Sequence, residues 1–241
     1  MTPRRRIVLT RQAAQNRPWA ERLQAAGHDV LELPLLRYRA LATAGEVRAD
    51  RYDWIMLTSP HAAEAFLGLG LDLGSARCAC LGPGTAAALV AAGGRDDLGL
   101  VTRDGVELAQ AFVARVPAPA RILLPGSSRR LAEPRAGLEQ AGFVVDELAL
   151  YETEPVPPAE LPADGPAARD VVFFASPSAV GAFVGAWDAR PDCVAIGETT
   201  ARAARAAGFP VALAATPDLE AMVLAAGLDP IPALADPRSG S

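Results

Sequence analysis

The sequence states the same pattern twice. The stretches "DWIMLTSPHAAEAF" at residues 53–66 and "DVVFFASPSAVGAF" at residues 170–183 each combine an apolar run, a Ser-Pro pair and an alanine-rich run. Three further pairs of segments match 115 residues apart: "RIVLTR" with "RILLPG", "ERLQAAGHDVLELPLL" with "AGLEQAGFVVDELALY", and "LGPGTAAALVAAG" with "IGETTARAARAAG". About half of the chain is therefore a copy of the other half, and any fold must contain two related parts.

Within each copy, short apolar runs alternate with runs of helical periodicity, a pattern typical of parallel α/β sheets. Strands are expected at residues 6–10, 29–35, 53–58, 77–82, 98–102, 121–125, 143–151, 170–175, 192–197 and 210–214. Helices are expected at residues 17–26, 60–69, 84–92, 105–115, 131–141, 177–187, 199–207 and 218–226. The predicted fold class is α/β, with two similar parallel-sheet lobes.

Capping residues support the helix predictions. Ser59-Pro60 and Ser176-Pro177 each place an N-cap serine before a proline in the first turn of a helix. Glycines follow four of the expected helices at their C-terminal ends: Gly27, Gly93, Gly142 and Gly208. Strand ends and helix starts therefore coincide in both copies.

A chain of 241 residues is long enough for two domains with separate cores. Matching segments of the two copies, "LPLLRYRA" and "LALYET", are each followed by a loose stretch, which suggests that the chain crosses between lobes twice. We expect one lobe at residues 1–37 plus 156–228, a second at residues 46–149, and linker strands at residues 38–45 and 150–155. A cleft between the lobes and a disordered tail at residues 229–241 complete the prediction.

Composition excludes several kinds of chemistry. The sequence has no lysine, since all 23 basic residues are arginine, so neither a Schiff base nor a P-loop lysine is available. Two histidines, and three cysteines without a Cys-x-x-Cys spacing, make a metal centre remote. The cysteines Cys78, Cys80 and Cys193 are expected to be buried, reduced thiols.

Charge and hydropathy limit the partners. A formal net charge of −5 argues against a general nucleic-acid binder. No apolar run is long enough to span a membrane, and the apolar residues 7–9 are too few for the core of a signal peptide. We therefore expect a cytoplasmic protein with no nucleic-acid or membrane partner.

A dinucleotide site is a weak alternative for one motif. Gly82-x-Gly84-x-x-Ala87 follows an expected strand and opens an expected helix, as a dinucleotide fingerprint does. The matching turn at Gly197 lacks the second glycine, and the acidic residue Asp104 stands where a helix cap is expected. The motif by itself is therefore poor evidence for a nicotinamide cofactor.

Five motifs in order resemble the uroporphyrinogen-III synthase family: "TSPHAAEAF", "LGPGTAAAL", "LLPGSSRR" followed by "AGFVVDELALYET", "FFASPSAVGAF" and "AIGETTARAARAAG". The resemblance extends from Arg5 to Ala226. It implies two α/β lobes joined by a two-stranded ladder, in a monomeric lyase without metal or organic cofactor. It also implies the reaction: hydroxymethylbilane loses water, ring D is inverted, and the macrocycle closes as uroporphyrinogen III. The alternative is a non-catalytic bilobal protein that binds a tetrapyrrole or another polyanion.

The resemblance also nominates site residues. Tyr151 matches the family's tyrosine on the returning linker strand and is predicted to be catalytic, as the acid that protonates the leaving hydroxyl; packing between the lobes is the alternative. Thr85 and Thr200 match the threonines of the family's two turns, and helix capping is their alternative role. His61 stands where some relatives carry arginine. The predicted substrate-binding residues are Ser59, Thr85, Ser128, Ser176, Thr200 and Arg11.

The expected substrate explains these choices physically. A hydroxymethylpyrrole loses water with the help of its own pyrrole nitrogen, so a weak proton donor is sufficient. Binding its eight carboxylates is the harder task, and the strand-to-helix turns supply free N–H groups and the positive ends of helix dipoles. Each helix end contributes only about 0.3–1 kcal/mol, so several must act with hydroxyls and arginines. Ser127, Ser128, Arg129 and Arg130 lie on such a turn, although solvated arginine is the simpler interpretation for each.

Overall fold

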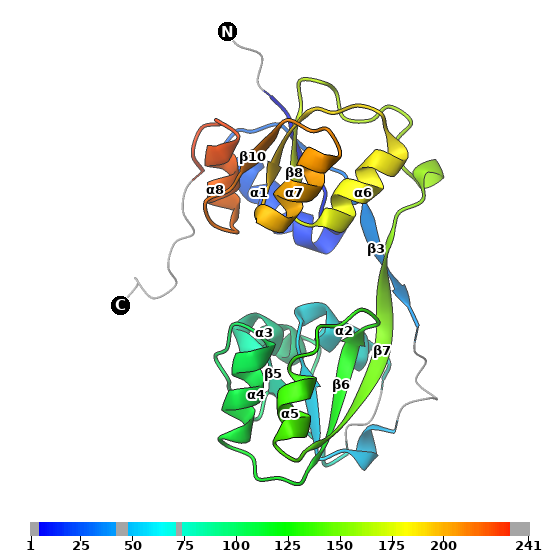
Figure 1. The fold of residues 1–241 in the computed structure, drawn as a ribbon, viewed down its shortest axis with the longest axis vertical. Coiled ribbons are helices and arrows are strands. Elements are labelled where there is room, and N and C mark those ends of the chain that lie inside the picture. Colours follow the sequence, from blue (N-terminus) through cyan, green and yellow to red (C-terminus); the bar gives the residue numbers. More distant parts are fainter. Residues whose placement is uncertain (1–4, 42–47, 71–73, 232–241) are drawn as a thin grey trace. The chain divides into compact units, whose positions relative to one another are not determined.

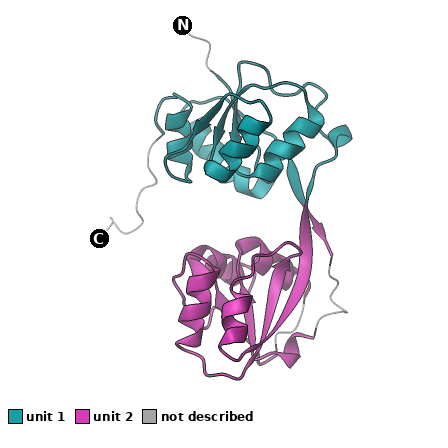
Figure 2. Cartoon of the chain, viewed as in Figure 1, with its two compact units in different colours: residues 1–37, 154–241 teal, residues 38–153 magenta. Residues whose placement is uncertain are grey.

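A computed structural model describes residues 5–41, 48–70 and 74–231 of the chain. The chain divides into two compact units, shown in different colours in Figure 2. Unit 1 comprises Met1–Arg37 and Glu154–Ser241, and unit 2 comprises Tyr38–Thr153. The boundaries therefore fall after Arg37, at the start of the predicted linker range 38–45, and after Thr153, within the predicted linker range 150–155; residues 42–45 lie outside the described residues.

Unit 1 is built on a five-stranded parallel sheet in the order β10-β9-β8-β1-β2 (Figure 1). Its strands are β1 (Ile7–Leu9), β2 (Val30–Glu32), β8 (Val171–Phe174), β9 (Asp192–Ala195) and β10 (Val211–Leu213). Its helices are α1 (Ala13–Ala25), α6 (Pro177–Ala186), α7 (Glu198–Ala206) and α8 (Leu219–Ala225), with a short 3-10 turn η3 (Pro158–Glu160).

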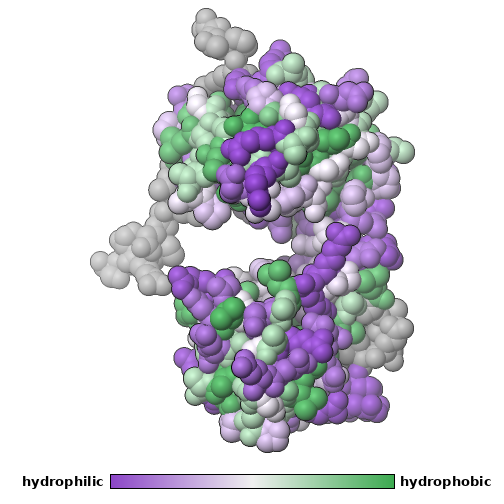
Figure 3. Space-filling view, in the orientation of Figure 1, coloured by the Kyte–Doolittle hydropathy of each residue, from purple (hydrophilic) through white to green (hydrophobic). Residues whose placement is uncertain are grey.

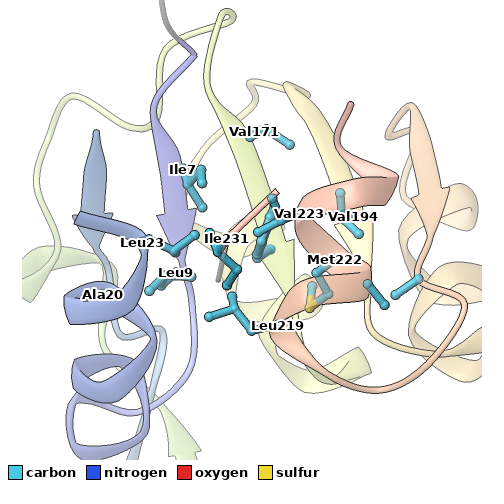
Figure 4. Packing of buried hydrophobic residues seen from close by; sticks show 13 residues of the cluster. Ile7, Leu9, Ala20, Leu23, Val171, Val194, Leu219, Met222, Val223 and Ile231 are labelled. Carbon is cyan, nitrogen blue, oxygen red and sulfur yellow. The ribbon is translucent and has the colours of Figure 1, made fainter. Parts of the chain in front are cut away.

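Alternation along the strands gives unit 1 two cores, one on each face of its sheet. Ile7 and Leu9 pack against α1 and α8, and Figure 4 shows this cluster. Val8 points the other way, into the cluster covered by α6 and α7. Ile231, which is buried, also belongs to the first cluster, so the disordered tail predicted from residue 229 begins too early; residues 232–241 lie outside the described residues.

Unit 2 has a sheet in the order β3-β7-β6-β4-β5. Its strands are β3 (Leu36–Ala40), β4 (Trp54–Leu57), β5 (Arg77–Cys80), β6 (Arg121–Ser127) and β7 (Val144–Pro155), of which β3 and β7 each extend two residues into unit 1. Its helices are α2 (Pro60–Gly68), α3 (Gly82–Ala91), α4 (Gly105–Val113) and α5 (Arg135–Gln140), with a 3-10 turn η2 (Ala49–Arg51). Ile55 and Leu57 pack on the side of α2 and α3, whereas Trp54 and Met56 pack on the side of α4 and α5.

Each unit combines part of both sequence copies. In unit 2 the strands β7, β6, β4 and β5 are parallel neighbours in the order in which their sequence counterparts β2, β1, β8 and β9 stand in unit 1. The fifth counterpart, the strand predicted at residues 98–102, does not form. Gly99 adopts a left-handed φ of 56° and Val101 is 86% exposed, so the segment leaves the sheet edge after the single bond from the Asp97 N–H to the Cys78 carbonyl.

Strands β3 and β7 form an antiparallel pair. The Val156 N–H donates to the Leu35 carbonyl at 2.9 Å and the Leu41 N–H to the Leu150 carbonyl at 2.8 Å, so partner numbers fall along one strand as they rise along the other. The guanidinium groups of Arg37 and Arg39 extend this register with ion pairs to carboxylates on β7.

All eight expected helices form, and the starts of two of them differ from the prediction by four residues. Helix α1 begins at Ala13, before Pro18, where residue 17 was predicted. Helix α5 begins at Arg135 instead of residue 131, because Pro134 disfavours helical backbone at the residue before it and itself becomes the N-cap. Among the described residues, no helix has the length and hydropathy that crossing a membrane requires.

Candidate functional site

A cavity of about 410 Å³ opens at the carboxyl ends of the parallel strands of unit 2. Thr58 and Ser59 follow β4, Leu81 follows β5, Ser127 ends β6, and Tyr151 lies where β7 makes its last pairing with β6. This is the edge at which open α/β sheets bind their ligands. We call it the unit 2 pocket.

Ser59 joins the start of α2 to the unit 2 pocket. Its Oγ accepts a hydrogen bond from the Ala62 N–H at 3.1 Å, which confirms the predicted N-cap. The same Oγ lies 3.4 Å from the phenolic oxygen of Tyr151. Ser176 caps α6 in unit 1 in the same way, through the Ala179 N–H at 3.2 Å, but it has no tyrosine beside it among its described contacts.

A β-bulge turns Tyr151 toward α2. Gly126 on β6 stands opposite Ala149, but the next residue, Ser127, stands opposite Tyr151, so Leu150 is an extra residue in β7. Strict alternation would put Leu150 and Tyr151 on opposite faces of the sheet. Instead both are buried in the cluster beside α2, with 3% and 7% of their surface exposed.

Three aromatic rings meet around Tyr151. The His61 ring stacks on the Tyr38 ring with centroids 3.5 Å apart and an interplanar angle of 10°. Tyr151 meets both rings edge-on, at 4.7 Å from Tyr38 and 4.4 Å from His61. Packing therefore accounts for the ring of Tyr151 within unit 2, while its hydroxyl lines the unit 2 pocket beside Ser59.

Arg130 is not the solvated arginine that its sequence position suggested. Only 19% of its side chain is exposed, and its guanidinium donates to the carbonyls of Leu124 and Ser127 on β6 and of Leu148 on β7. Burial lowers the pKa of Arg130, and the nearby carboxylate of Glu147 acts in the opposite direction. The side chain therefore links the backbones of the two neighbouring strands through hydrogen bonds to carbonyls of both.

Two of the three other arginines around the unit 2 pocket also have carboxylate partners. Arg103 pairs with Glu107, and Arg135 pairs with Glu139 at 2.8 Å and with Glu147 at 3.1 Å. The guanidinium of Arg129 has no partner among the residues that the structure describes, although its backbone N–H donates to the Ser127 Oγ at 3.2 Å. Arg129 is therefore a cation at the pocket that remains available for a carboxylate. The visible face of unit 2 is largely hydrophilic (Figure 3).

Thr85 and Thr200 do not cap helices. Each lies in the first turn of its helix, and the N-cap positions belong to Leu81 for α3 and Gly197 for α7. Both threonines are buried, with 3% and 4% exposed, and neither hydroxyl has a hydrogen-bond partner in the described part of the chain. The prediction that they act as caps is wrong, and an unpaired hydroxyl remains at corresponding places in the two units.

The other predicted site residues have local contacts. Arg11, in unit 1, lies over the Trp19 ring at 4.5 Å. The Ser128 N–H donates to the Tyr151 carbonyl at 2.8 Å, and Ser128 lines a hollow beside Arg130 instead of the unit 2 pocket. The unit 2 pocket thus contains Ser59 and Tyr151, whereas Arg11, Ser176 and Thr200 belong to unit 1.

Glycine at the start of α3 has a structural cause. Gly82 has a φ of 72°, and a Cβ at this position would lie 2.9 Å from the Thr102 carbonyl oxygen. Asp104, the acid considered for a ribose, is the N-cap of α4 and accepts from the Glu107 N–H at 2.9 Å. Local geometry therefore accounts for these residues without a dinucleotide.

The described residues contain no group of three or more histidines, cysteines and acids that could hold a metal ion. All three cysteines are free and buried, as predicted. Burial raises the pKa of Cys78 to about 11 and those of Cys80 and Cys193 to about 12, so these thiols stay protonated at neutral pH.

Sequence reasoning missed three parts of this site: the bulge in β7, the burial of Arg130 and the stacking of His61 on Tyr38. Matching of the two copies gives a partial signal, because Tyr151 stands where the other copy has Leu36. The pairing shift itself depends on contacts between β6 and β7, which no local pattern in the sequence encodes.

Comparisons with known proteins agree on one family. The family profile described as uroporphyrinogen-III synthase HemD matches residues 17–224. The chloroplastic uroporphyrinogen-III synthase of Oryza sativa subsp. japonica is 30% identical over 222 residues, which cover 84% of this chain and 73% of that protein. The uroporphyrinogen-III synthase of Synechococcus elongatus is 30% identical over 177 residues, covering 66% of this chain and 63% of that protein.

Solved structures resemble the fold. The uroporphyrinogen-III synthetase of Helicobacter pylori superimposes with a TM-score of 0.65 at 18% identity, covering 92% of this chain and 98% of that one. A mutant uroporphyrinogen III synthase of the extremely thermophilic bacterium Thermus thermophilus gives a TM-score of 0.53 at 18% identity, covering 92% and 97% of the two chains. These likenesses confirm the α/β fold class with parallel sheets.

Proposed function

Because this chain belongs to the uroporphyrinogen-III synthase family, we propose that it uses the unit 2 pocket and Tyr151 to convert hydroxymethylbilane into uroporphyrinogen III. The family cyclises this linear tetrapyrrole in haem biosynthesis. The observation that carries the proposal for the site is the phenol of Tyr151, which lies 3.4 Å from the Ser59 Oγ where both line the pocket. The alternative of a non-catalytic tetrapyrrole or polyanion binder is not favoured.

The first step is loss of water from the hydroxymethyl group. The pyrrole nitrogen donates electron density as the carbon–oxygen bond breaks, and the Tyr151 phenol gives its proton to the departing hydroxyl, which leaves as water. The cationic carbon left behind then bonds to the α-carbon of ring D that already carries the methylene from the neighbouring ring. The bond between that methylene and ring D breaks, and the methylene bonds instead to the unsubstituted α-carbon of ring D, so ring D is inverted as the macrocycle closes. The proton that this ring loses restores the phenol. The reaction therefore consumes no external oxidant, reductant or nucleophile.

Ser59 and Tyr151 have complementary parts in this step. The Ser59 Oγ already accepts the Ala62 N–H, so its own proton is free to hydrogen-bond the phenolic oxygen. A hydroxyl donor beside the phenol would stabilise the negative charge that develops on Tyr151 as it releases its proton. Ser59 thus couples the start of α2 to the acid.

Carboxylates of the substrate have two kinds of partner at this edge. The free N–H groups at the start of α2 and the positive end of its dipole favour an anion. The unpaired guanidinium of Arg129 offers a charge-assisted hydrogen bond. In unit 1, Ser176, Thr200 and Arg11 are proposed to bind substrate carboxylates.

We classify the reaction as that of a hydro-lyase without metal or organic cofactor. We propose that the protein is a cytoplasmic monomer that binds neither nucleic acid nor a membrane. The acidic net charge of −5 supports the absence of a nucleic-acid partner, because it disfavours binding to phosphates.

Product analysis tests the function. Purified protein is incubated with hydroxymethylbilane, and the uroporphyrin isomers are separated after oxidation. The type III isomer is expected to dominate, whereas the same reaction without protein gives the type I isomer by spontaneous closure. Formation of the type I isomer at the spontaneous rate in the presence of protein would refute the proposal, and tight binding without turnover would favour the non-catalytic alternative.

A further inference from the structure

The aromatic contacts of Tyr151 come from three separate elements of unit 2. Tyr38 lies on β3, His61 in the first turn of α2, and Tyr151 on β7. The two partner rings are parallel and in contact at 3.5 Å, and Tyr151 meets both at angles of 63° and 66°. The stacked pair of Tyr38 and His61 therefore packs against one side of the Tyr151 ring.

This stacked pair restricts the side-chain torsions of Tyr151 and hence the position of its phenolic oxygen. A tyrosine has two side-chain torsions, and a change of the first torsion moves the hydroxyl, which is the atom farthest from the backbone. With Tyr38 and His61 in contact with the ring, such a change would require the stacked pair to move as well. The contact with these two rings therefore keeps the Tyr151 hydroxyl at the observed distance of 3.4 Å from the Ser59 Oγ.

The stacked imidazole suits a half-buried place. Only 29% of the His61 side chain is exposed, and burial lowers its pKa, which keeps the ring neutral at neutral pH. Glu64 on the same helix, with its Oε2 3.6 Å from the His61 Nδ1, raises that pKa in opposition. A flat neutral ring stacks on Tyr38 and needs no counterion.

We propose that His61 and Tyr38 are positioning residues for Tyr151, which they hold by ring contact so that its phenol faces Ser59 and the pocket. The inference rests on the proposed role of Tyr151 in the reaction. Neither ring is among the residues that line the unit 2 pocket, so both act through Tyr151. A purely structural role for the stack is the competing explanation, and it predicts changes in stability without changes in the placement of the phenol.

The kinetic test compares variants that keep and that remove the ring at position 61. His61→Phe keeps a flat neutral ring and is expected to retain kcat within about threefold. His61→Ala removes one ring of the stacked pair. Because a misplacement of a catalytic group by about 1 Å can lower the rate on the order of 10²-fold, kcat is expected to fall about 10- to 100-fold with KM little changed. Ser178→Ala is the matched control, since Ser178 is the exposed residue after Ser-Pro in the other copy, and its kcat should equal that of the wild type.

A spectroscopic test is independent of activity. The sequence has three tyrosines, so a Tyr38→Phe, Tyr52→Phe background leaves Tyr151 as the sole tyrosine and keeps a ring at position 38. Ring-labelled tyrosine then gives one NMR signal in the full chain. His61→Phe should leave this signal sharp and at its position, whereas His61→Ala should shift and broaden it because the ring samples several orientations.

The outcomes separate this inference from the function on which it rests. Wild-type kcat and an unchanged ring signal in His61→Ala would overturn the positioning role, even if Tyr151→Phe is inactive. An active Tyr151→Phe would instead overturn the acid, whatever the ring signal does. Should His61→Ala fail to fold, Tyr38→Leu removes the other half of the stack, and the same shift in signal and fall in kcat are expected; their absence would refute the inference.

Discussion

The two units share a strand order, but different side chains donate hydrogen bonds to the backbone carbonyls of the matching strands β1 and β6. In unit 1, the amide of Asn16 donates to the carbonyls of Leu9 and Arg11 just beyond β1. In unit 2, the guanidinium of Arg130 donates to the carbonyl of Leu124, which corresponds to Leu9, and to those of Ser127 on β6 and Leu148 on β7. A neutral, fully buried group thus serves one copy, and a cation serves the other.

The difference extends to the ligand-binding edge. Tyr151 on β7 corresponds to Leu36 in the other copy, and the bulge at Leu150 brings the tyrosine beside Ser59. Unit 1 extends its sheet with β10, whereas the matching segment of unit 2 leaves the sheet and continues to Arg103 and Asp104 at the pocket. Duplication therefore supplied a scaffold twice, and the later differences gave unit 2 a phenol and a buried cation at this edge.

The largest effect should come from the residue that most separates the copies. Tyr151→Phe removes the proton donor and keeps the packed ring, so turnover should fall by about 10² to 10⁴ with folding nearly unchanged. The rate of type III isomer formation is the measurement. Tyr52→Phe serves as a control, because Tyr52 does not line the unit 2 pocket. Type III formation by Tyr151→Phe within about twofold of wild type would leave only the packing role.

A second comparison tests the two ways of completing a strand end. Arg130→Met removes a donor from three carbonyls and Asn16→Leu removes one from two, although the Leu9 carbonyl keeps the Leu33 N–H as a donor. Each variant should lower the free energy of unfolding by about 1–3 kcal/mol, more for Arg130. Hydrogen exchange followed by peptide should show faster opening in unit 2 for the first variant and in unit 1 for the second. Equal changes in both units would contradict the separate roles.

Much of this architecture could be predicted from local patterns. Helices with an N-cap serine and a following proline, such as α2 and α6, are determined within a few residues, and their caps formed as expected. The wrong or missed predictions concern features that depend on contacts between segments far apart in the sequence. The segment 98–102 has an apolar sequence like that of β10 but lacks its pairing, because Gly99 turns the chain away. The bulge that places Tyr151 depends on the register between β6 and β7, and the burial of Arg130 depends on carbonyls from both strands.

The two N-cap serines allow a sharper comparison at smaller cost. Ser59→Ala and Ser176→Ala should each destabilise the protein by about 1 kcal/mol, because each removes the acceptor of one helix N–H. Ser59→Ala should in addition lower kcat about 3- to 10-fold, since it removes a hydrogen bond to Tyr151 worth roughly 0.5–1.5 kcal/mol. Thermal unfolding and kcat are measured on the same preparations. A loss of kcat as large in Ser176→Ala would show that the phenol contact does not distinguish the units.

The smallest change in stability is expected at the paired threonines. Because neither Thr85 nor Thr200 caps its helix and neither hydroxyl has a partner in the described part of the chain, replacing either by valine removes no hydrogen bond within the protein. The free energy of unfolding should fall little or not at all, because a methyl group replaces a buried hydroxyl that has no internal partner. A loss near 1 kcal/mol would instead indicate a cap.

Activity then reveals whether both units hold the substrate. A hydroxyl that bonds a substrate carboxylate in the ground and transition states alike raises KM when it is removed and leaves kcat unchanged. Thr85→Val and Thr200→Val should therefore each raise KM by about 3- to 10-fold, as one hydrogen bond of roughly 0.5–1.5 kcal/mol requires. Thr85→Ser and Thr200→Ser keep the hydroxyl and are the controls. A rise confined to Thr85→Val would assign substrate binding at these turns to unit 2 alone, because the serine controls exclude an effect of helix geometry.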